Sequence, residues 1–112
     1  MTPVMRFEGI YTPVVTPYDA VGAPKLDVLA DVIENLVAAG VHGIISGGST
    51  GENYTQTVAE RMELARFTQE RINGRVPLIV GTGAMLTAES LALAEGARAM
   101  GADAILVASP PY

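Results

Sequence analysis

The sequence predicts an α/β fold built on a parallel β-sheet. Four short apolar runs rich in β-branched residues predict the strands, at residues 10–16, 41–46, 76–80 and 104–108. Stretches with helical periodicity separate these runs. Three times a helical stretch meets a glycine and a strand begins within a few residues, at Gly40, Gly74 and Gly101. Repeated βα units of this length are typical of parallel strands joined by helical crossovers.

Each predicted helix has a recognisable start or end. Asp27 is a plausible N-cap for the first helix, whose apolar residues then follow at spacings of three and four: Leu29, Val32, Ile33, Leu36 and Val37. The second helix begins with a capping box, in which Thr57 and Glu60 satisfy each other's exposed backbone N–H groups, and should run to about residue 73. A third helix is predicted between residues 87 and 101.

The same pattern predicts a core. We expect the helix residues Leu29, Val32, Ile33 and Leu36 to cover a set of buried strand residues, namely Val14, Val15, Ile44, Ile45, Leu78, Ile79, Val80, Ile105, Leu106 and Val107. In a half-barrel the first and last strands would lack a neighbour on one side. The strand residues that face the barrel interior would then be exposed, and residues 14–16 and 104–108 would be the two unpaired edges and the main candidates for self-association.

Two architectures fit four strands and three helices: a small open doubly wound sheet, or half of an eight-stranded barrel. The 112 residues suit one segment, 1–112, and exclude a two-domain protein. A complete barrel needs about 250 residues. The sequence stops at residues 109–112, directly after a strand and with no helix to cover it, so we expect a truncated fragment.

Composition excludes several functions. The net charge of -5 and the pI near 4.6 argue against nucleic-acid and anionic membrane partners. The chain has no cysteine, which excludes disulfides and thiolate chemistry. No secretion signal or membrane-spanning run is apparent, so we expect a cytoplasmic protein. His42 is the single histidine and is expected to cap or pack near a strand start; no metal or cofactor site is indicated.

Ligands of parallel α/β proteins gather beyond the carboxyl ends of the strands, which directs attention to residues 47–52. In this segment, here called the anion-binding loop, Gly48 lets the backbone approach a ligand closely. The N–H groups of Ser49, Thr50 and Gly51, with two hydroxyls, suit a carboxylate or a phosphate. Alternatively, the loop is a tight turn whose hydroxyls cap its own backbone.

Neither glycine-rich segment fits a nucleotide site. The anion-binding loop lacks the Gly-Lys-Ser/Thr ending of a nucleotide P-loop, which disfavours ATP or GTP. The segment from Gly81 to Gly83 lacks the third glycine of a dinucleotide fingerprint, and an ordinary βα turn is favoured there.

Four segments together resemble one known family. They are the anion-binding loop Gly-Gly-Ser-Thr-Gly-Glu, Thr-Pro-Val-Val-Thr-Pro at residues 12–17, Gly-Arg-Val-Pro-Leu-Ile-Val-Gly-Thr-Gly at 74–83 and Ala-Ser-Pro-Pro-Tyr at 108–112. In order and spacing the chain resembles the dihydrodipicolinate synthase and N-acetylneuraminate lyase family. The resemblance implies the N-terminal half of a (β/α)8 TIM barrel, in an enzyme that uses pyruvate and an aldehyde through a Schiff base on lysine, commonly as a homotetramer.

The resemblance also implies roles for individual residues. Ser49 and Thr50, with Gly48 beside them, match the positions that hold the carboxylate of pyruvate, and Ser49 matches the hydroxyl that joins a tyrosine in a proton relay. Tyr112 matches the tyrosine that reaches across a dimer interface and extends this relay. Glu52 matches the end of the motif, where we expect a structural role. Hydroxyl groups can move protons without placing a second charge beside a carboxylate.

The covalent part of the family's chemistry is missing from these residues. The family's Schiff-base lysine and its main catalytic tyrosine lie on later strands, which would follow Tyr112. The single lysine, Lys25, lies in a polar loop beside Pro24 and is not expected to form an imine. We therefore expect a lyase activity for the parent protein and no activity for the 112 residues alone.

Three functional hypotheses follow. The first is a synthase-like class I aldolase, because Gly81-Thr-Gly83 is similar to the synthase branch. The second is N-acetylneuraminate lyase or another 2-keto-3-deoxy sugar acid aldolase, because Ser49 and the segment 52–56 are similar to that branch. The third, of another class, is a small α/β module that binds an anion without catalysis.

Overall fold

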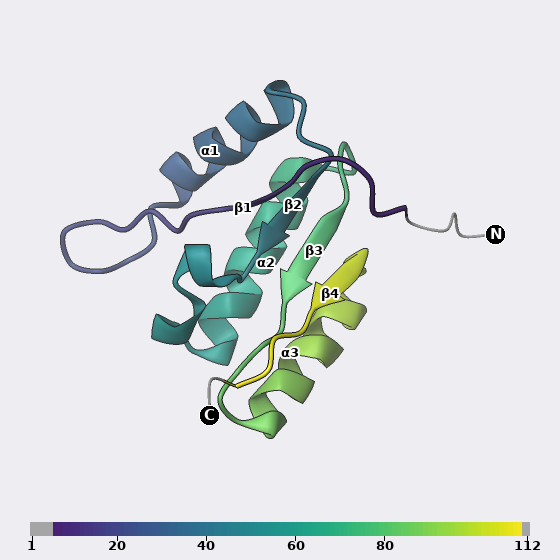
Figure 1. The fold of residues 1–112 in the computed structure, drawn as a ribbon. Helices are drawn as coiled ribbons and strands as arrows, with labels where there is room; N and C mark the ends of the chain where they lie inside the picture. Colours follow the sequence, from purple (N-terminus) through teal and green to yellow (C-terminus); the bar gives the residue numbers. More distant parts are fainter. Residues whose placement is uncertain (1–5, 111–112) are drawn as a thin grey trace.

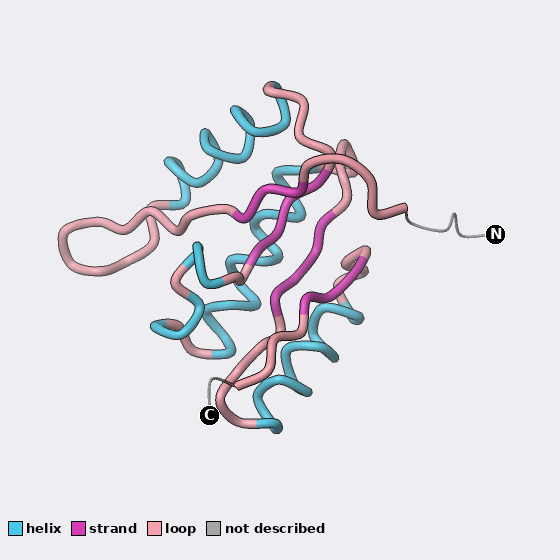
Figure 2. Tube along the Cα trace, in the orientation of Figure 1, coloured by secondary structure: helices cyan, strands magenta, loops and turns pink. Residues whose placement is uncertain are grey.

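A computed structural model describes residues 6–110 and contains one four-stranded parallel sheet with helices packed against it (Figure 1). The strands lie in the order β1 (Tyr11–Pro13), β2 (Gly43–Ser46), β3 (Leu78–Gly81) and β4 (Ala104–Leu106). The longer helices are α1 (Leu26–Ala38), α2 (Val58–Ile72) and α3 (Thr87–Ala99). Strands and helices alternate along the chain (Figure 2), which confirms the predicted order.

The register of the sheet divides its side chains between two faces. Ile44 pairs with Leu78, whereas Ile45 pairs with Ile79, which pairs in turn with Ala104. Paired residues of neighbouring strands point to the same side of a sheet. Ile44 and Leu78 therefore share one face, and this is the face that belongs to the main hydrophobic core.

The helices cover this face. α2 lies behind β2 and β3 in the view of Figure 1 and packs between α1 and α3. Each helix contributes buried side chains, including Leu29 and Ile33 from α1, Ala65 and Ile72 from α2, and Leu93 and Ala97 from α3. The burial predicted for Leu29 and Ile33 is confirmed, whereas Val32 and Leu36 are half-buried. No helix of the described part is long and apolar enough to cross a membrane.

Both edges of the sheet are open, which corrects part of the predicted core. Val14, Ile44, Leu78, Ile79 and Val80 are buried as predicted, and Ile45 is half-buried. The prediction is wrong for the remaining strand residues, whose exposed fractions are 47% for Val15, 44% for Ile105, 47% for Leu106 and 64% for Val107. The reason is topological: within residues 6–110, β1 and β4 each have a strand on one side only.

The predicted N-cap of α1 is wrong. The cap residue is Lys25, without a side-chain cap bond, and Asp27 lies in the first turn of the helix. The preceding loop closes on itself because Lys25 N donates to Pro17 O at 2.8 Å, and Leu29 N then donates to Lys25 O at 3.0 Å. This closure places the N-cap two residues ahead of Asp27. The Asp27 carboxylate still lies near the positive end of the helix dipole.

The strands are shorter than the apolar runs that predicted them. Val41 does not join β2, because its N–H closes the end of α1 by donating to Leu36 O at 3.4 Å. Gly40, just before it, has a φ of +89°, as expected for a glycine that terminates a helix. Pro77 has no N–H to donate, and β3 begins after it at Leu78.

The capping box at the start of α2 is confirmed and can be tested. Glu60 N donates to Thr57 Oγ1 at 3.1 Å, and Thr57 N donates to Glu60 Oε1 at 2.9 Å. We predict that Thr57→Ala lowers the free energy of unfolding by about 1 kcal/mol in chemical denaturation. The matched control is Thr87→Ala, since Thr87 begins α3, whose N-cap is Leu86 without a side-chain cap bond. Equal losses in both variants would contradict the assignment.

The pH dependence of this capping box follows from the same hydrogen bonds. Those from Thr57 lower the pKa of the Glu60 carboxyl below its ordinary value. A lowered folded-state pKa means stabilisation that is present above the unfolded pKa and lost as pH falls through the folded one. Glu60→Gln should therefore lower the free energy of unfolding at neutral pH and by less in denaturation measured at acidic pH, where Glu60 itself is protonated, whereas a pH-independent loss would argue against a charged Glu60.

Two leucines of α3 provide a test of the core. Leu93 is fully buried in the hydrophobic core, whereas Leu91 is 59% exposed. We predict that Leu93→Ala lowers the free energy of unfolding by about 2–5 kcal/mol, because it removes buried methyl groups and leaves a cavity. Leu91→Ala should change it by no more than about 0.5 kcal/mol. Denaturation of both variants checks the helix face, and a larger loss for Leu91→Ala would refute it.

Candidate active site

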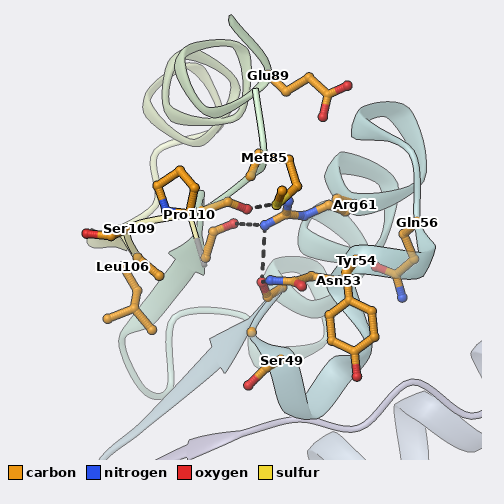
Figure 3. A pocket seen from close by; sticks show the side chains of 16 residues that line it. Ser49, Asn53, Tyr54, Gln56, Arg61, Met85, Glu89, Leu106, Ser109 and Pro110 are labelled. Carbon is orange, nitrogen blue, oxygen red and sulfur yellow. Dashed lines mark hydrogen bonds between the residues drawn. The ribbon is translucent and has the colours of Figure 1, made fainter. Parts of the chain in front are cut away.

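A cavity of about 450 Å³ lies at the edge of the sheet where the strands end (Figure 3). Its walls come from the segments that follow β2, β3 and β4 and from the first turns of α2 and α3. Polar lining residues include Ser49, Tyr54, Arg61 and Glu89. The candidate loops predicted from the sequence after these three strands therefore contribute to one concave surface.

The anion-binding loop contains the first of two short turns after β2, and the second turn follows it directly. These are the 3₁₀ turns η1 (Ser49–Gly51) and η2 (Asn53–Thr55), joined by Glu52 in the left-handed conformation with φ of +63°. Gly51 N donates to Gly48 O at 3.1 Å. The expectation that the Gly51 amide faces a ligand is therefore wrong, because that amide is used inside the turn.

Ser49 and Thr50 remain the ligand-facing candidates of this loop. Both residues are exposed, and no side chain caps the turn that contains them. Their amides open the turn, so they have no carbonyl within it to which they could donate. Ser49 and Gly48 also line the cavity, whereas Thr50 is not among its lining residues. The alternative, in which the hydroxyls cap their own turn, is not what the structure shows.

Arg61 connects this loop to the segment after β3, a role that the sequence analysis missed. Its Nη2 donates to Gly81 O at 2.8 Å and to Gly47 O at 3.2 Å, and its Nη1 donates to Gly83 O at 2.8 Å. Figure 3 shows the guanidinium between these carbonyls. One side chain of α2 thus fixes the backbone of two neighbouring loops.

The Arg61 guanidinium is buried, with 6% of the residue exposed. Burial lowers the pKa of Arg61, while the negative charge of Glu89 acts in the opposite direction. The group stays protonated at neutral pH, since an arginine titrates far above that range. Its Nε has no hydrogen-bond partner among residues 6–110. The cation is therefore held by neutral carbonyls rather than by a carboxylate in direct contact.

Sequence periodicity contained a signal for Arg61. The residue lies on the buried stripe of α2 that continues through Ala65, Thr68 and Ile72, at spacings of four, three and four. A cation on such a stripe needs a local partner, because burying an unpaired charge is costly. The stripe is hard to recognise in the sequence, because two of its four members, Arg61 and Thr68, are polar.

Gln56 fixes the other side of the anion-binding loop. Its Nε2 lies 2.9 Å from Gly51 O and 2.8 Å from Tyr18 Oη, and Thr16 Oγ1 also donates to Gly51 O at 2.8 Å. Thr16 and Tyr18 belong to the segment after β1. The loop is therefore tied to the preceding βα unit through Gln56 and to the following one through Arg61.

Close backbone contact explains the glycines after β3. A Cβ atom at Gly81 would collide with the carbonyl of Gly47, and one at Gly83 would lie 3.2 Å from the Ala108 side chain. The expectation of an ordinary βα turn here missed this requirement. Glycine is needed at position 81 because two loop backbones touch there.

The remaining predicted residues have simpler places. His42 has the structural role expected, since its Nδ1 accepts from Ile10 N at 2.9 Å. Glu52 joins the two turns through its backbone, with its carbonyl accepting from Thr55 Oγ1 at 2.7 Å. Lys25 is exposed at the start of α1. Tyr112, the predicted relay tyrosine, lies outside the described residues. Within residues 6–110, no three His, Asp or Glu side chains group as metal ligands would.

The chain is similar to known proteins in both sequence and fold. A curated 4-hydroxy-tetrahydrodipicolinate synthase from Methanospirillum hungatei JF-1 is 41% identical over 108 residues, which cover 95% of this chain and 37% of that protein. The structure of dihydrodipicolinate synthase from Aquifex aeolicus matches with a TM-score of 0.90 and 35% identity, over 95% of this chain and 36% of that one.

A second similar structure contains a ligand. It is a prophage protein of the dihydrodipicolinic acid synthase family from E. coli K12 in complex with pyruvate, with a TM-score of 0.91 and 38% identity, over 95% of this chain and 36% of that one. The chain thus spans little more than a third of the length of these relatives. The match confirms the predicted fold class, the N-terminal part of a (β/α)8 barrel. Since the model of the dihydrodipicolinate synthetase family matches residues 6–112, the chain belongs to that family.

Proposed function

We propose that residues 1–112 form the N-terminal half of a (β/α)8 lyase that condenses pyruvate with an aldehyde, of the 4-hydroxy-tetrahydrodipicolinate synthase type. The observation that carries this proposal is the anion-binding loop: exposed Ser49 and Thr50 on a backbone fixed by Arg61 and Gln56, in a chain of this family. The pyruvate bound to the E. coli K12 relative supports the choice of ligand. The curated synthases among the relatives support the synthase branch over the sugar-acid aldolases.

In this proposal the chain supplies the carboxylate-binding part of the site. Ser49 and Thr50 donate hydrogen bonds to the carboxylate of pyruvate, and the glycine at position 48 lets the ligand come close to the backbone. Ser49 also passes a proton between the reacting imine and Tyr112. A hydroxyl suits both tasks, because it can donate and accept and carries no charge that would repel a carboxylate.

The covalent step requires a lysine that this stretch does not provide. An imine forms when an uncharged amine attacks the ketone carbon and water leaves, so its lysine must lie beside the bound pyruvate. Lys25 is the single lysine of the sequence and is exposed at the start of α1. In this proposal the imine-forming lysine therefore lies outside residues 1–112. The proposed enzyme is a cytoplasmic homo-oligomer and needs no cofactor.

Borohydride trapping tests the proposal. With pyruvate and sodium borohydride, the 112-residue chain should gain no pyruvyl adduct by intact mass, because Lys25 is remote from the anion-binding loop in sequence and lies in an exposed segment. A longer protein that contains this chain should gain one adduct, on a lysine outside these residues. The control omits pyruvate. An adduct on Lys25, or none on the longer protein, would refute the assignment.

The two hydroxyls should differ in their kinetic effect. In the longer protein, Thr50→Val removes only a hydrogen bond to a carboxylate, and hydrogen bonds to charged groups contribute about 1.5–3 kcal/mol. We therefore predict that KM for pyruvate rises roughly 10- to 100-fold with little change in kcat. Ser49→Ala should lower kcat as well, because Ser49 also passes a proton.

Steady-state kinetics with pyruvate as the varied substrate makes this comparison. Thr87→Val is the matched control, since Thr87 is also an exposed threonine but lies at the start of α3, outside the anion-binding loop. Unchanged KM values in both loop variants would refute the assigned binding role and favour a purely structural turn in this segment.

A further inference from the structure

Arg61 has hydrogen bonds that stability alone does not explain. Its guanidinium is buried and reaches three backbone carbonyls, those of Gly47, Gly81 and Gly83. Within residues 6–110 it forms no salt bridge. A buried charge without a paired opposite charge costs folding free energy, and an apolar side chain of similar volume is commonly as stable. The carbonyls that it orients are the remaining reason for its position.

The Gly47 carbonyl is the point where Arg61 acts on the anion-binding loop. This carbonyl belongs to the peptide bond that leads into Gly48 and Ser49, and a peptide unit is planar. Fixing the Gly47 oxygen therefore also fixes the direction of the Gly48 N–H. Asn53 Nδ2 donates to the same oxygen at 2.9 Å, from the far end of the loop. Arg61 and Asn53 thus hold the loop at its origin from two sides.

The other two hydrogen bonds of Arg61 tie this loop to its neighbour. Gly81 and Gly83 follow directly on β3, and the backbone of Gly81 already touches that of Gly47. A guanidinium presents its donors in one rigid plane, so bonds to both loops fix their relative position as well as their distance. A lysine has no such planar fork.

We propose that Arg61 is a positioning residue that sets the anion-binding loop for the carboxylate of an α-keto acid. This inference rests on the proposed function and extends it to a residue that does not touch the substrate. Its guanidinium lies in the wall of the cavity that Ser49 lines, where Glu89 contributes a charge of opposite sign, so the positioning role of Arg61 rests on its hydrogen bonds to the loop rather than on its charge. Loss of Arg61 should therefore weaken substrate binding more than it slows the bound substrate's reaction.

The test uses the longer protein that contains this chain and three variants: Arg61→Met, Arg61→Lys and Arg75→Met. Arg75 is the matched control, because it also bonds backbone carbonyls, those of Ile72 and Arg71, but lies at the surface and pairs with Glu34 at 2.8 Å. KM for pyruvate, kcat, borohydride trapping at saturating pyruvate and the thermal midpoint are measured for each. Wild-type protein that traps no pyruvate refutes the proposed function itself.

The expected result is a split between binding and turnover. Arg61→Met should raise KM for pyruvate at least about tenfold, with kcat and trapping at saturation changed less than about threefold. Arg61→Lys should recover part of this loss, since an ammonium group still donates hydrogen bonds but lacks the planar fork. Arg75→Met should leave KM unchanged.

Several outcomes would overturn the proposal. One is a folded Arg61→Met variant with wild-type KM, in an enzyme that still traps pyruvate. Another is a loss that Arg75→Met reproduces, which would make the role of Arg61 merely structural. If Arg61→Met does not fold, Arg61→Lys decides: an increase in KM of about threefold or more supports the proposal, and an unchanged KM refutes it.

Discussion

The arrangement of the candidate site depends on one buried cation. The loops that follow parallel strands leave the sheet, so their carbonyls lose the partners that the ladder provides, and a buried carbonyl without a partner is costly. Arg61 donates to the carbonyls of Gly47, Gly81 and Gly83, and Asn53 Nδ2 adds a second hydrogen bond to the first of them. A hydroxyl or amide could serve one or two of these oxygens, whereas a guanidinium has five N–H donors in a plane. The choice of arginine follows from the number and layout of the acceptors.

Most of the fold could be predicted because it follows from local patterns. The capping box at Thr57 and the helix-ending glycine at Gly40 act within a few residues of chain, and both were predicted correctly. The errors arose where distant contacts decide the outcome. The hydrogen bond from Lys25 N to Pro17 O accompanies a helix α1 that starts before the predicted cap, Asp27. Ile105 is exposed because it lies on an edge strand. Neither fact is contained in the residues next to the error.

The site was predictable to a smaller extent, for the same reason. Glycine and hydroxyl content marked the anion-binding loop, whose Ser49 and Thr50 are exposed, and their role in binding an anion stays a prediction. Arg61 and Gln56 were missed, because their roles depend on partners that are distant in the sequence. The carbonyls that Arg61 binds lie 14 to 22 positions away along the chain, and the Tyr18 hydroxyl that Gln56 binds lies 38 positions away. Composition identifies a loop that could bind an anion, but only the tertiary fold shows which side chains give that loop one conformation.

The contacts that fix the anion-binding loop lie between neighbouring βα units. Binding of the substrate carboxylate is therefore separate from formation of the imine. Arg61 links the second unit to the third, and Gln56 links it to the first. None of these contacts involves the exposed edge at Ile105 and Val107, where the sheet is open. The loop conformation is therefore set without the strands that would complete a barrel. If the imine-forming lysine belongs to those strands, changes at Arg61 act on the carboxylate end of the substrate and leave the lysine's surroundings unaltered.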